Sequence, residues 1–248
     1  SRVRVATLPG MKKYARFGAA FGRKSLEFSE NYYAIPYPLP KMDLIAIPDF
    51  AIGDMENWGA ITFREKLLLH YPGITSKFGE ERICEVIAHE IAHQWFGNLV
   101  TPSDWRYLWL NESFATYFGF GVVAHYYPNW ETWQQFLRGQ TGTAMVRDAL
   151  HETFAIEIPG GEHVVINAST APIIYSKGGS ILRQVEGYIG AENFQKVLQD
   201  YLKAYEYDTA ASHNLWEAFE QASEQPIAEM MKSWIEQAGF PMISVKKQ

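Results

Sequence analysis

The sequence predicts an α+β fold in which a small sheet is followed by a mainly α-helical lobe. Two observations support this prediction. Short apolar segments, separated by prolines and glycines, fill about the first 75 residues, and helical spacing of apolar side chains dominates most of the remaining sequence. A chain of 248 residues can bury a large core. We therefore expect one domain with a sheet-containing lobe at about 1–75 and a helical lobe at about 76–248.

The sheet lobe is predicted from short segments that differ in composition. Pro36, Pro38 and Pro40 exclude regular structure from 32–41, because proline lacks a backbone donor. The polar, glycine-bounded stretch 53–57 is expected to be a loop at the edge of the sheet. The predicted elements are, in order, the end of a strand at 1–5, a helix at 11–28, a strand at 42–48 and a strand at 59–64.

The helical lobe is predicted from apolar residues at a spacing of three and four. Gly97 stands at the end of a predicted helix, Pro128 and Gly239 follow two others, and all three are typical of helix ends. Pro159, Gly160 and their neighbours indicate a long loop at 157–170. The predicted helices lie near 79–97, 111–126, 130–149, 173–189, 191–205, 212–223 and 226–238.

Composition argues against some classes of partner and indicates a cellular compartment. A formal net charge of -6 argues against a nucleic-acid surface, because such surfaces carry an excess of Lys and Arg. No run of eighteen apolar residues predicts a membrane segment. The single cysteine, Cys84, excludes an internal disulfide and favours a reducing compartment, so a cytoplasmic location is predicted. The chain begins at Ser1 without a signal pattern, and we expect it to be a fragment of a longer protein.

A metal site is predicted where His89 and His93 stand four residues apart inside an apolar-periodic helix. Residues at this spacing share a helix face, with Cβ atoms roughly 6 Å apart, so both imidazoles can hold one ion. A catalytic zinc site needs a third protein ligand and one open position. Glu112 is the best candidate, since it follows His93 by nineteen positions and belongs to a second predicted helix.

The surroundings of Glu112 support its role as a ligand. Asn111 is predicted to cap this second helix, which would put Glu112 in the first turn, where the positive helix end favours an ionised carboxylate. Glu90 adjoins a ligand but cannot reach the ion in the same geometry. It is therefore predicted to be the general base that takes a proton from the attacking water and passes it to the leaving amine.

Four motifs in one order give the chain a family resemblance. They are Gly53-Asp54-Met55-Glu56-Asn57, His89 to His93 continuing to Asn98, Trp109-Leu110-Asn111-Glu112, and Tyr175-Ser176-Lys177-Gly178. The chain resembles the zinc aminopeptidases of the aminopeptidase N and puromycin-sensitive type, which are gluzincins and include the archaeal tricorn-interacting factors. This resemblance implies a thermolysin-like catalytic domain with a mixed sheet, one zinc ion per chain, and peptide substrates with a free N-terminus.

The resemblance also assigns roles to individual residues. It implies that Glu56 binds the free amino group of the substrate by charge-assisted hydrogen bonds, which would make the enzyme an exopeptidase. Gly53, Asp54, Met55 and Asn57 would contact the substrate beside it. Tyr175 would donate a hydrogen bond to the oxyanion of the tetrahedral intermediate.

The chain departs from the family in one residue and in extent. Asp54 stands where a small residue such as alanine is common, and it adds a negative charge beside Glu56. Relatives of this type also carry flanking domains, and one of these supplies a second acidic residue for the amino group. We therefore expect this chain to bind zinc but to cleave peptides weakly by itself.

Two alternatives to a simple aminopeptidase remain open at this point. A bifunctional enzyme of the leukotriene type shares the zinc site and also opens an epoxide, and a catalytically weak peptide-binding fragment could keep the fold. The remaining histidines show no ligand-like spacing, and the aromatic run at 117–130 is expected to pack in the core. These histidines are His70, His125, His151, His163 and His213.

Overall fold

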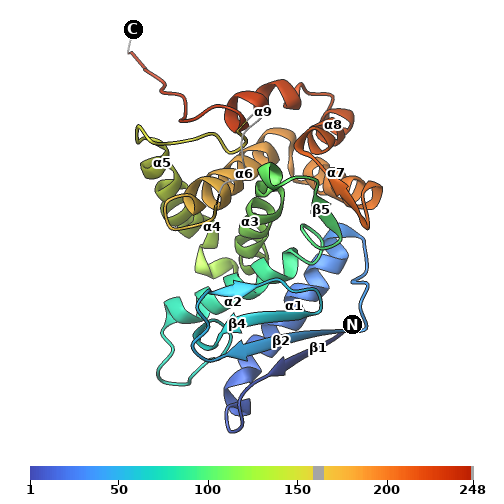
Figure 1. Ribbon diagram of the computed structural model, residues 1–248, viewed down its shortest axis with the longest axis vertical. Coiled ribbons are helices and arrows are strands. Elements are labelled where there is room, and N and C mark those ends of the chain that lie inside the picture. The colour runs from blue at the N-terminus through green and yellow to red at the C-terminus, as the bar shows by residue number, and fades with distance from the viewer. Residues whose placement is uncertain (159–164, 247–248) are drawn as a thin grey trace.

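A four-stranded mixed sheet forms the N-terminal part of the computed structural model, which describes residues 1–158 and 165–246. The strand order is β1-β2-β4-β3. Strands β1 (Arg2–Ala6), β2 (Lys41–Ile47) and β4 (Ala60–Arg64) run parallel, and β3 (Asp54–Met55) pairs antiparallel with β4 at the edge. Figure 1 shows this sheet at one end of the molecule and most of the helices at the other.

One face of the sheet is apolar and is covered by helix α1 (Arg16–Tyr33), which follows a 3-10 helix at Lys12–Ala15. Burial alternates along β2, where Met42 and Leu44 are fully buried, as expected for a half-buried strand. The helix lies close to the sheet, because a Cβ atom at Gly22 would be 2.8 Å from Leu44 Cδ1. Helix α2 (Lys77–Ala92) packs on the same α1.

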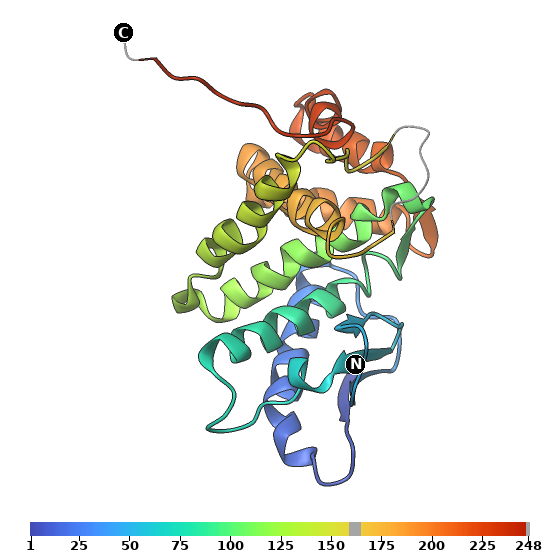
Figure 2. The same cartoon turned by 60° about the vertical axis from the view of Figure 1, so that its left-hand side comes forward.

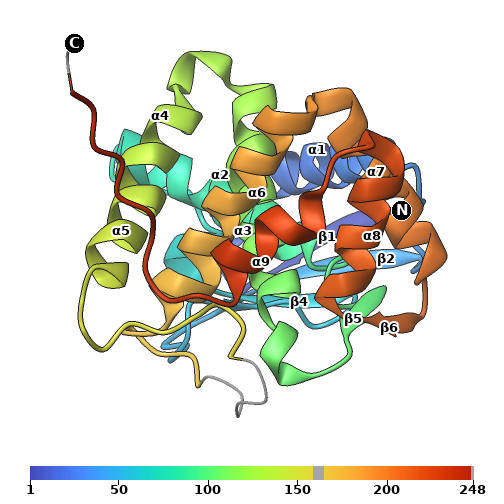
Figure 3. The same ribbon diagram turned by 90° about the horizontal axis from the view of Figure 1, so that it is seen from above.

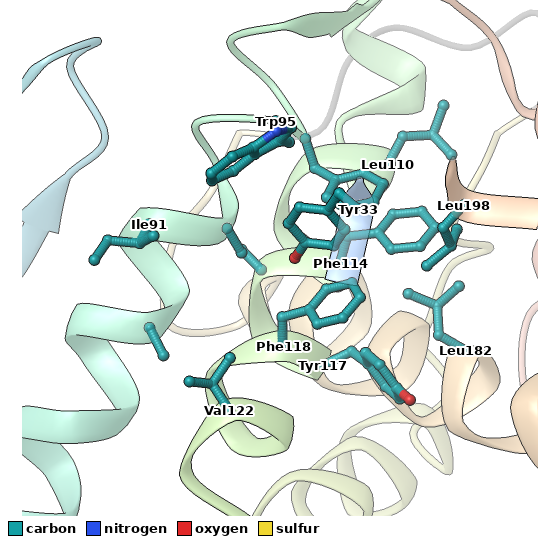
Figure 4. Close-up of a cluster of buried hydrophobic side chains, with 14 of the residues drawn as sticks. Tyr33, Ile91, Trp95, Leu110, Phe114, Tyr117, Phe118, Val122, Leu182 and Leu198 are labelled. Carbon is teal, nitrogen blue, oxygen red and sulfur yellow. The ribbon is translucent and has the colours of Figure 1, made fainter. Parts of the chain in front are cut away.

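Helix α3 (Trp109–Tyr126) is buried along most of its length and lies between α2 and α6 (Gly178–Ile189). Its aromatic residues form much of the core, and Figure 4 shows Phe114 and Phe118 gathered with Tyr33 and Trp95. Phe114 stacks on Phe96 with ring centroids 4.2 Å apart, and Phe118 meets Tyr33 edge-on at 5.0 Å. This packing fixes α3 against α2, which places their facing side chains.

Helix α3 lies near the centre of the molecule in the view of Figure 3, and α4 (Thr132–Phe136) packs against it beside α2 and α6. Figure 2 shows the last described residues leaving the helical lobe as an extended segment. Two π-helical segments, Leu137–Thr141 and Pro172–Lys177, interrupt the regular helices. The remaining elements are β5 (Val100–Pro102), 3-10 helices at Glu65–Leu67, Trp105–Tyr107 and Pro128–Trp130, α5 (Gly142–Asp148), α7 (Ala191–Ala204), β6 (Asp208–Ala210), α8 (Ser212–Ser223) and α9 (Ile227–Ile235).

The predicted fold class is confirmed, with corrections in detail. The stretch 53–57 is not entirely a loop, because β3 pairs with β4 there. The helix predicted to reach residue 97 ends at Ala92, and α3 begins at Trp109 with Leu108 as its N-cap. Asn111 therefore lies inside the helix and does not cap it. Strands β5 and β6, which pair in parallel, were not predicted. The predicted loop residues 159–164, His163 among them, lie outside the described residues.

Candidate metal centre and peptide-binding site

Helix α2 carries both predicted histidine ligands near its C-terminal end. Ser76 caps the helix by accepting a backbone N–H of the first turn, and Ile87 and Ile91 are fully buried in the core. His89 and His93 are four residues apart, and their ring centroids are 4.7 Å apart. His93 is the C-cap residue, so the helix ends where the second imidazole is needed.

Helix α3 brings Glu112 to the same point from the other side. Glu112 lies in the first turn, as predicted, and its Oε2 is 3.6 Å from His89 Nε2 and 3.4 Å from His93 Nε2. Ligand atoms about 2.0 to 2.2 Å from a tetrahedral zinc ion are about 3.3 to 3.6 Å from one another. The donor types and spacings thus fit a zinc ion.

In the absence of a metal, the charges of this cluster hold a proton on His93. Burial lowers the pKa of His93, but the neighbouring Glu112 carboxylate outweighs burial and raises that pKa to about 9. Burial raises the pKa of Glu112, yet His93 and His89 overcome it and hold the pKa well below its usual range. Without a metal, His93 and Glu112 therefore form an ion pair, and a metal ion would displace the proton.

Glu90 projects into the same cavity but has a different environment. Its side chain is 1% exposed, and its Oε2 has no hydrogen-bond partner in the described part of the chain. Burial raises the pKa of Glu90 well above its usual range, and the Asp54 and Glu56 carboxylates raise it further. A carboxyl group with a raised pKa can both accept and return a proton near neutral pH.

Glu56 follows the edge strand β3 and is tied to the helices through its backbone. Its carbonyl oxygen accepts hydrogen bonds from Gln94 Nε2 at 3.1 Å and Asn98 Nδ2 at 2.9 Å. Its carboxylate Oε1 accepts a hydrogen bond from Asn111 Nδ2 at 3.1 Å. The acidic side chain is therefore held beside the metal cluster, where ligand atoms of Glu56, His93 and Glu112 lie within 4.8 Å of one another.

Tyr175 reaches the cluster from the π-helical segment Pro172–Lys177. Its ring lies nearly parallel to that of His89, with centroids 6.1 Å apart. The segment is fixed to the other π-helical segment by a hydrogen bond from Ser176 Oγ to Gln140 Oε1 at 2.6 Å. Burial, and then the Glu112 carboxylate, raise the pKa of Tyr175 far above its usual range, so the phenol stays a hydrogen-bond donor.

These side chains line one cavity of about 830 Å³ between the sheet edge and the helices. Asn57 does not line it. Its side chain extends from the turn between β3 and β4 and donates to Met55 O of β3 and Thr62 Oγ1 of β4. The predicted residues that line the cavity are Gly53, Asp54, Met55, Glu56, His89, Glu90, His93, Glu112 and Tyr175.

Comparison with known proteins identifies the family. The peptidase family M1 domain matches residues 17–234. The chain belongs to peptidase family M1. A leucyl aminopeptidase of Saccharolobus solfataricus is 44% identical over 241 residues, which cover 97% of this chain and 31% of that protein. Aminopeptidase M1 of Arabidopsis thaliana is 42% identical over 245 residues, which cover 99% of this chain and 28% of that protein.

This M1 peptidase chain spans less than a third of the length of those two relatives. Within the described residues, none of the helices combines the length and the apolar character that a membrane crossing requires.

The M1 site also contains residues that sequence reasoning missed. Asn111 was interpreted only as a helix cap, although it directly precedes Glu112 in a quoted motif. Its amide instead contacts both His93 and Glu56. The segment around β5 adds another wall, and nothing in its sequence pattern indicated this. Its cavity-lining residues are Thr101, Pro102, Ser103, Asp104 and Trp105.

Proposed function

We propose that this chain carries the catalytic site of a zinc-dependent aminopeptidase, which hydrolyses the bond after the first residue of a peptide. One observation carries the proposal. A single oxygen of Glu112 lies 3.6 and 3.4 Å from the Nε2 atoms of His89 and His93, in a cavity that also contains the Glu56 carboxylate. The aminopeptidase names of the relatives agree with this activity.

His89, His93 and Glu112 would hold one zinc ion per chain. Two imidazole nitrogens and a carboxylate oxygen are the donors of many catalytic zinc sites. When bound, zinc supplies Lewis acidity, which polarises a carbonyl oxygen and lowers the pKa of water to about 7. The burial of His93 and Glu112 keeps competing bulk water away from these ligands.

Glu90 would act first as the general base and then as the general acid. It is buried, adjoins the ligand His89 and lines the same cavity, so it can take a proton from the attacking water and deliver it to the leaving nitrogen. Asp54 and Glu56 raise its pKa, which favours its holding that proton between the two steps.

Tyr175 would stabilise the charge that develops on the carbonyl oxygen. Its phenol remains protonated and stands beside His89, so it can donate a hydrogen bond to the oxyanion. One such donor contributes roughly 3 to 4 kcal/mol to transition-state stabilisation.

Glu56 would select the free amino end of the substrate. A carboxylate at this wall of the cavity attracts an ammonium group, which internal peptide bonds lack. Asp54 lines the same cavity and adds negative charge, which further favours a cationic group. We also infer a cytoplasmic location, which the single, buried Cys84 supports.

The alternatives gain no support from the site. The relatives above are named aminopeptidases, and no observation in the described residues favours epoxide opening or a peptide-binding role without catalysis.

The substitution Glu90→Gln tests the proposal. The variant should bind one zinc per chain by elemental analysis, because the ligands are untouched. Its cleavage of a leucyl fluorogenic substrate should fall about 100- to 10,000-fold, the usual contribution of a general base.

Glu81→Gln is the matched control. It lies on the same helix, pairs with Lys77 at 3.8 Å and does not line the cavity, so its cleavage should stay near that of the unaltered chain. The unaltered chain and the two variants should all fail to cleave an N-acetylated substrate. Undiminished turnover by Glu90→Gln, or equal cleavage of the acetylated substrate, would contradict the proposal.

A further inference from the structure

The Asn111 side chain lies between two groups with different proposed tasks. It is 7% exposed. Its Oδ1 is hydrogen-bonded to His93 Nδ1, and its Nδ2 donates to Glu56 Oε1 at 3.1 Å. One amide therefore touches both a metal ligand and the residue proposed to bind the substrate's amino group.

The hydrogen-bond partners fix the orientation of this amide. An ionised Glu56 can only accept hydrogen bonds, so the Asn111 atom that faces it must be the NH₂ group. The amide oxygen must then face His93, whose Nδ1 must carry its proton. Phe96 O also accepts from this Nδ1, at 3.2 Å. In the metal-binding form, the other ring nitrogen, Nε2, is thus left with a free lone pair 3.4 Å from Glu112 Oε2.

The surrounding backbone leaves the amide little room to move. Gly97 has φ +119, and a Cβ atom there would overlap Asn111 Oδ1. On the other side, Gln94 and Asn98 hold the Glu56 backbone. The amide is therefore confined between the end of α2 and the residue that follows β3.

We propose that Asn111 is a positioning residue that couples the amine-binding carboxylate of Glu56 to the metal ligand His93. It sets the distance between the anchored amino group and the metal, so that the carbonyl of the first residue, and not of the second, reaches the ion. This inference rests on the proposed aminopeptidase function. It deepens that function, because the hydrogen bonds of Asn111 to Glu56 and His93 would account for cleavage after the first residue of the peptide.

A double-mutant cycle with Glu56→Ala and Asn111→Leu tests the coupling through zinc affinity, which needs no turnover. Asn111→Leu should weaken zinc binding about 10- to 100-fold, as expected when a partner of a ligating histidine is lost. Glu56→Ala should weaken it through lost charge. Because part of each loss passes through the same amide, the loss in the double variant should be smaller than the product of the single losses by about threefold or more.

Steady-state kinetics give a readout that a purely structural role would not change. Asn111→Leu should raise KM for a leucyl substrate about tenfold in the Glu56 background and leave KM unchanged in the Glu56→Ala background, since the anchor is already gone. Its effect on kcat, which passes through His93, should persist in both backgrounds. If Asn111→Leu loses its helical circular dichroism signal, Asn111→Ala replaces it in the cycle.

Asn193→Leu is the matched control. Asn193 lies on α7, donates to Ile189 O at 2.9 Å and does not line the cavity. The variant should keep zinc affinity within about twofold. Strictly multiplicative zinc losses, or an equal zinc loss in Asn193→Leu, would overturn the coupling. Absent cleavage by the unaltered chain would instead contradict the proposed function, and the zinc cycle would still report on Asn111.

Discussion

The sheet lobe and the helical lobe bury different kinds of side chain. No charged side chain is buried in the sheet lobe, residues 1–75, all of which the structure describes. Its strands bury apolar residues such as Met42 and Phe63, and its charged pairs lie at the surface. The buried charged side chains of the described chain all belong to the helical lobe and are Glu90, His93, Glu112, Asp148, Glu157 and Lys177.

Because of this difference, the sheet lobe is stabilised mainly by apolar packing, whereas the helical lobe also buries the charges proposed for catalysis. A buried charge is costly unless it is paired and hydrogen-bonded, and a buried group without a partner, such as Glu90, has a shifted pKa instead. The proposed metal ligands and proton carrier are among these charges. The sheet lobe contributes mainly its edge, where Glu56 is half-buried next to β3. The proposed catalytic groups thus stand on helices fixed by packing, and the proposed amine anchor stands on the margin of the sheet.

The largest effect on stability is expected from the buried pair of Lys177 and Asp148. The Lys177 Nζ lies 2.8 Å from Asp148 Oδ2, the side chains are 7% and 2% exposed, and Lys177 also donates to Gly239 O at 2.9 Å. Lys177→Met leaves the Asp148 carboxylate buried without its cation. The free energy of unfolding, measured by urea titration, should fall by about 3 to 5 kcal/mol.

Lys196→Met provides the control for that substitution. Lys196 pairs with Asp200 at 2.5 Å, but the two side chains are 64% and 57% exposed. Solvent screens such a pair, so the loss should be about 1 kcal/mol or less. Equal losses in the two variants would mean that burial does not make the helical lobe depend on its charge pairs.

A smaller effect on stability is expected from two glycines with positive φ angles, one in each lobe. Gly97 of the helical lobe and Gly10 of the sheet lobe have φ values of +119 and +86. A Cβ atom at Gly97 would press on Asn111, whereas nothing lies within 4 Å of one at Gly10. Gly97→Ala should therefore cost about 2 to 3 kcal/mol of unfolding free energy and weaken zinc binding, and Gly10→Ala should cost about 1 kcal/mol and leave zinc binding unchanged.

The unfolding free energies of the two variants separate the cost of an alanine at positive φ from the cost of its contact with Asn111. Both substitutions introduce an alanine at positive φ, so their difference reports the contact with Asn111. If the two losses were equal and zinc affinity were unchanged, the amide would not be held by Gly97.

Sequence reasoning placed the candidate site well where the signal was local. His89 and His93 share a helix face because of their spacing, and Glu112 was placed correctly in a first turn. Asn111 was misinterpreted, because asparagine is also a favoured N-cap and its two partners lie 18 and 55 residues away. Contacts over such separations depend on how α2, α3 and the sheet edge pack together.

The fold was likewise predictable where the sequence signal was local, but not where segments far apart in the sequence pair. Periodicity indicated the sheet-then-helices order and most of the helices, because amphipathic patterns are local. Strands β5 and β6 escaped prediction, since each is short and the pair forms between Val100 and Asp208, far apart in sequence. The π-helical segment with Tyr175 is likewise set by its contacts with the segment that contains Gln140.

The smallest effect is expected from the exposed charges of the sheet lobe. Asp43 lies 2.6 Å from Arg4 Nε and 2.7 Å from Lys41 Nζ, and its side chain is 18% exposed. The hydrogen bond from Arg4, with help from Lys41, lowers the pKa of Asp43 to about 2. A lowered pKa stabilises the folded state above the ordinary value of about 4, and this contribution is lost as pH falls towards about 2.

Asp43→Asn should therefore destabilise the chain by about 0.2 to 1 kcal/mol at about pH 7, and its difference from the unaltered chain should shrink as the pH falls from about 4 to about 2. Urea titrations at these pH values measure both quantities. Asp200→Asn, which removes a single exposed partner in the helical lobe, should have a smaller effect at neutral pH. A loss at Asp43 as large as that at Lys177 would contradict the contrast between the lobes, because a charge open to solvent would then matter as much as a buried one.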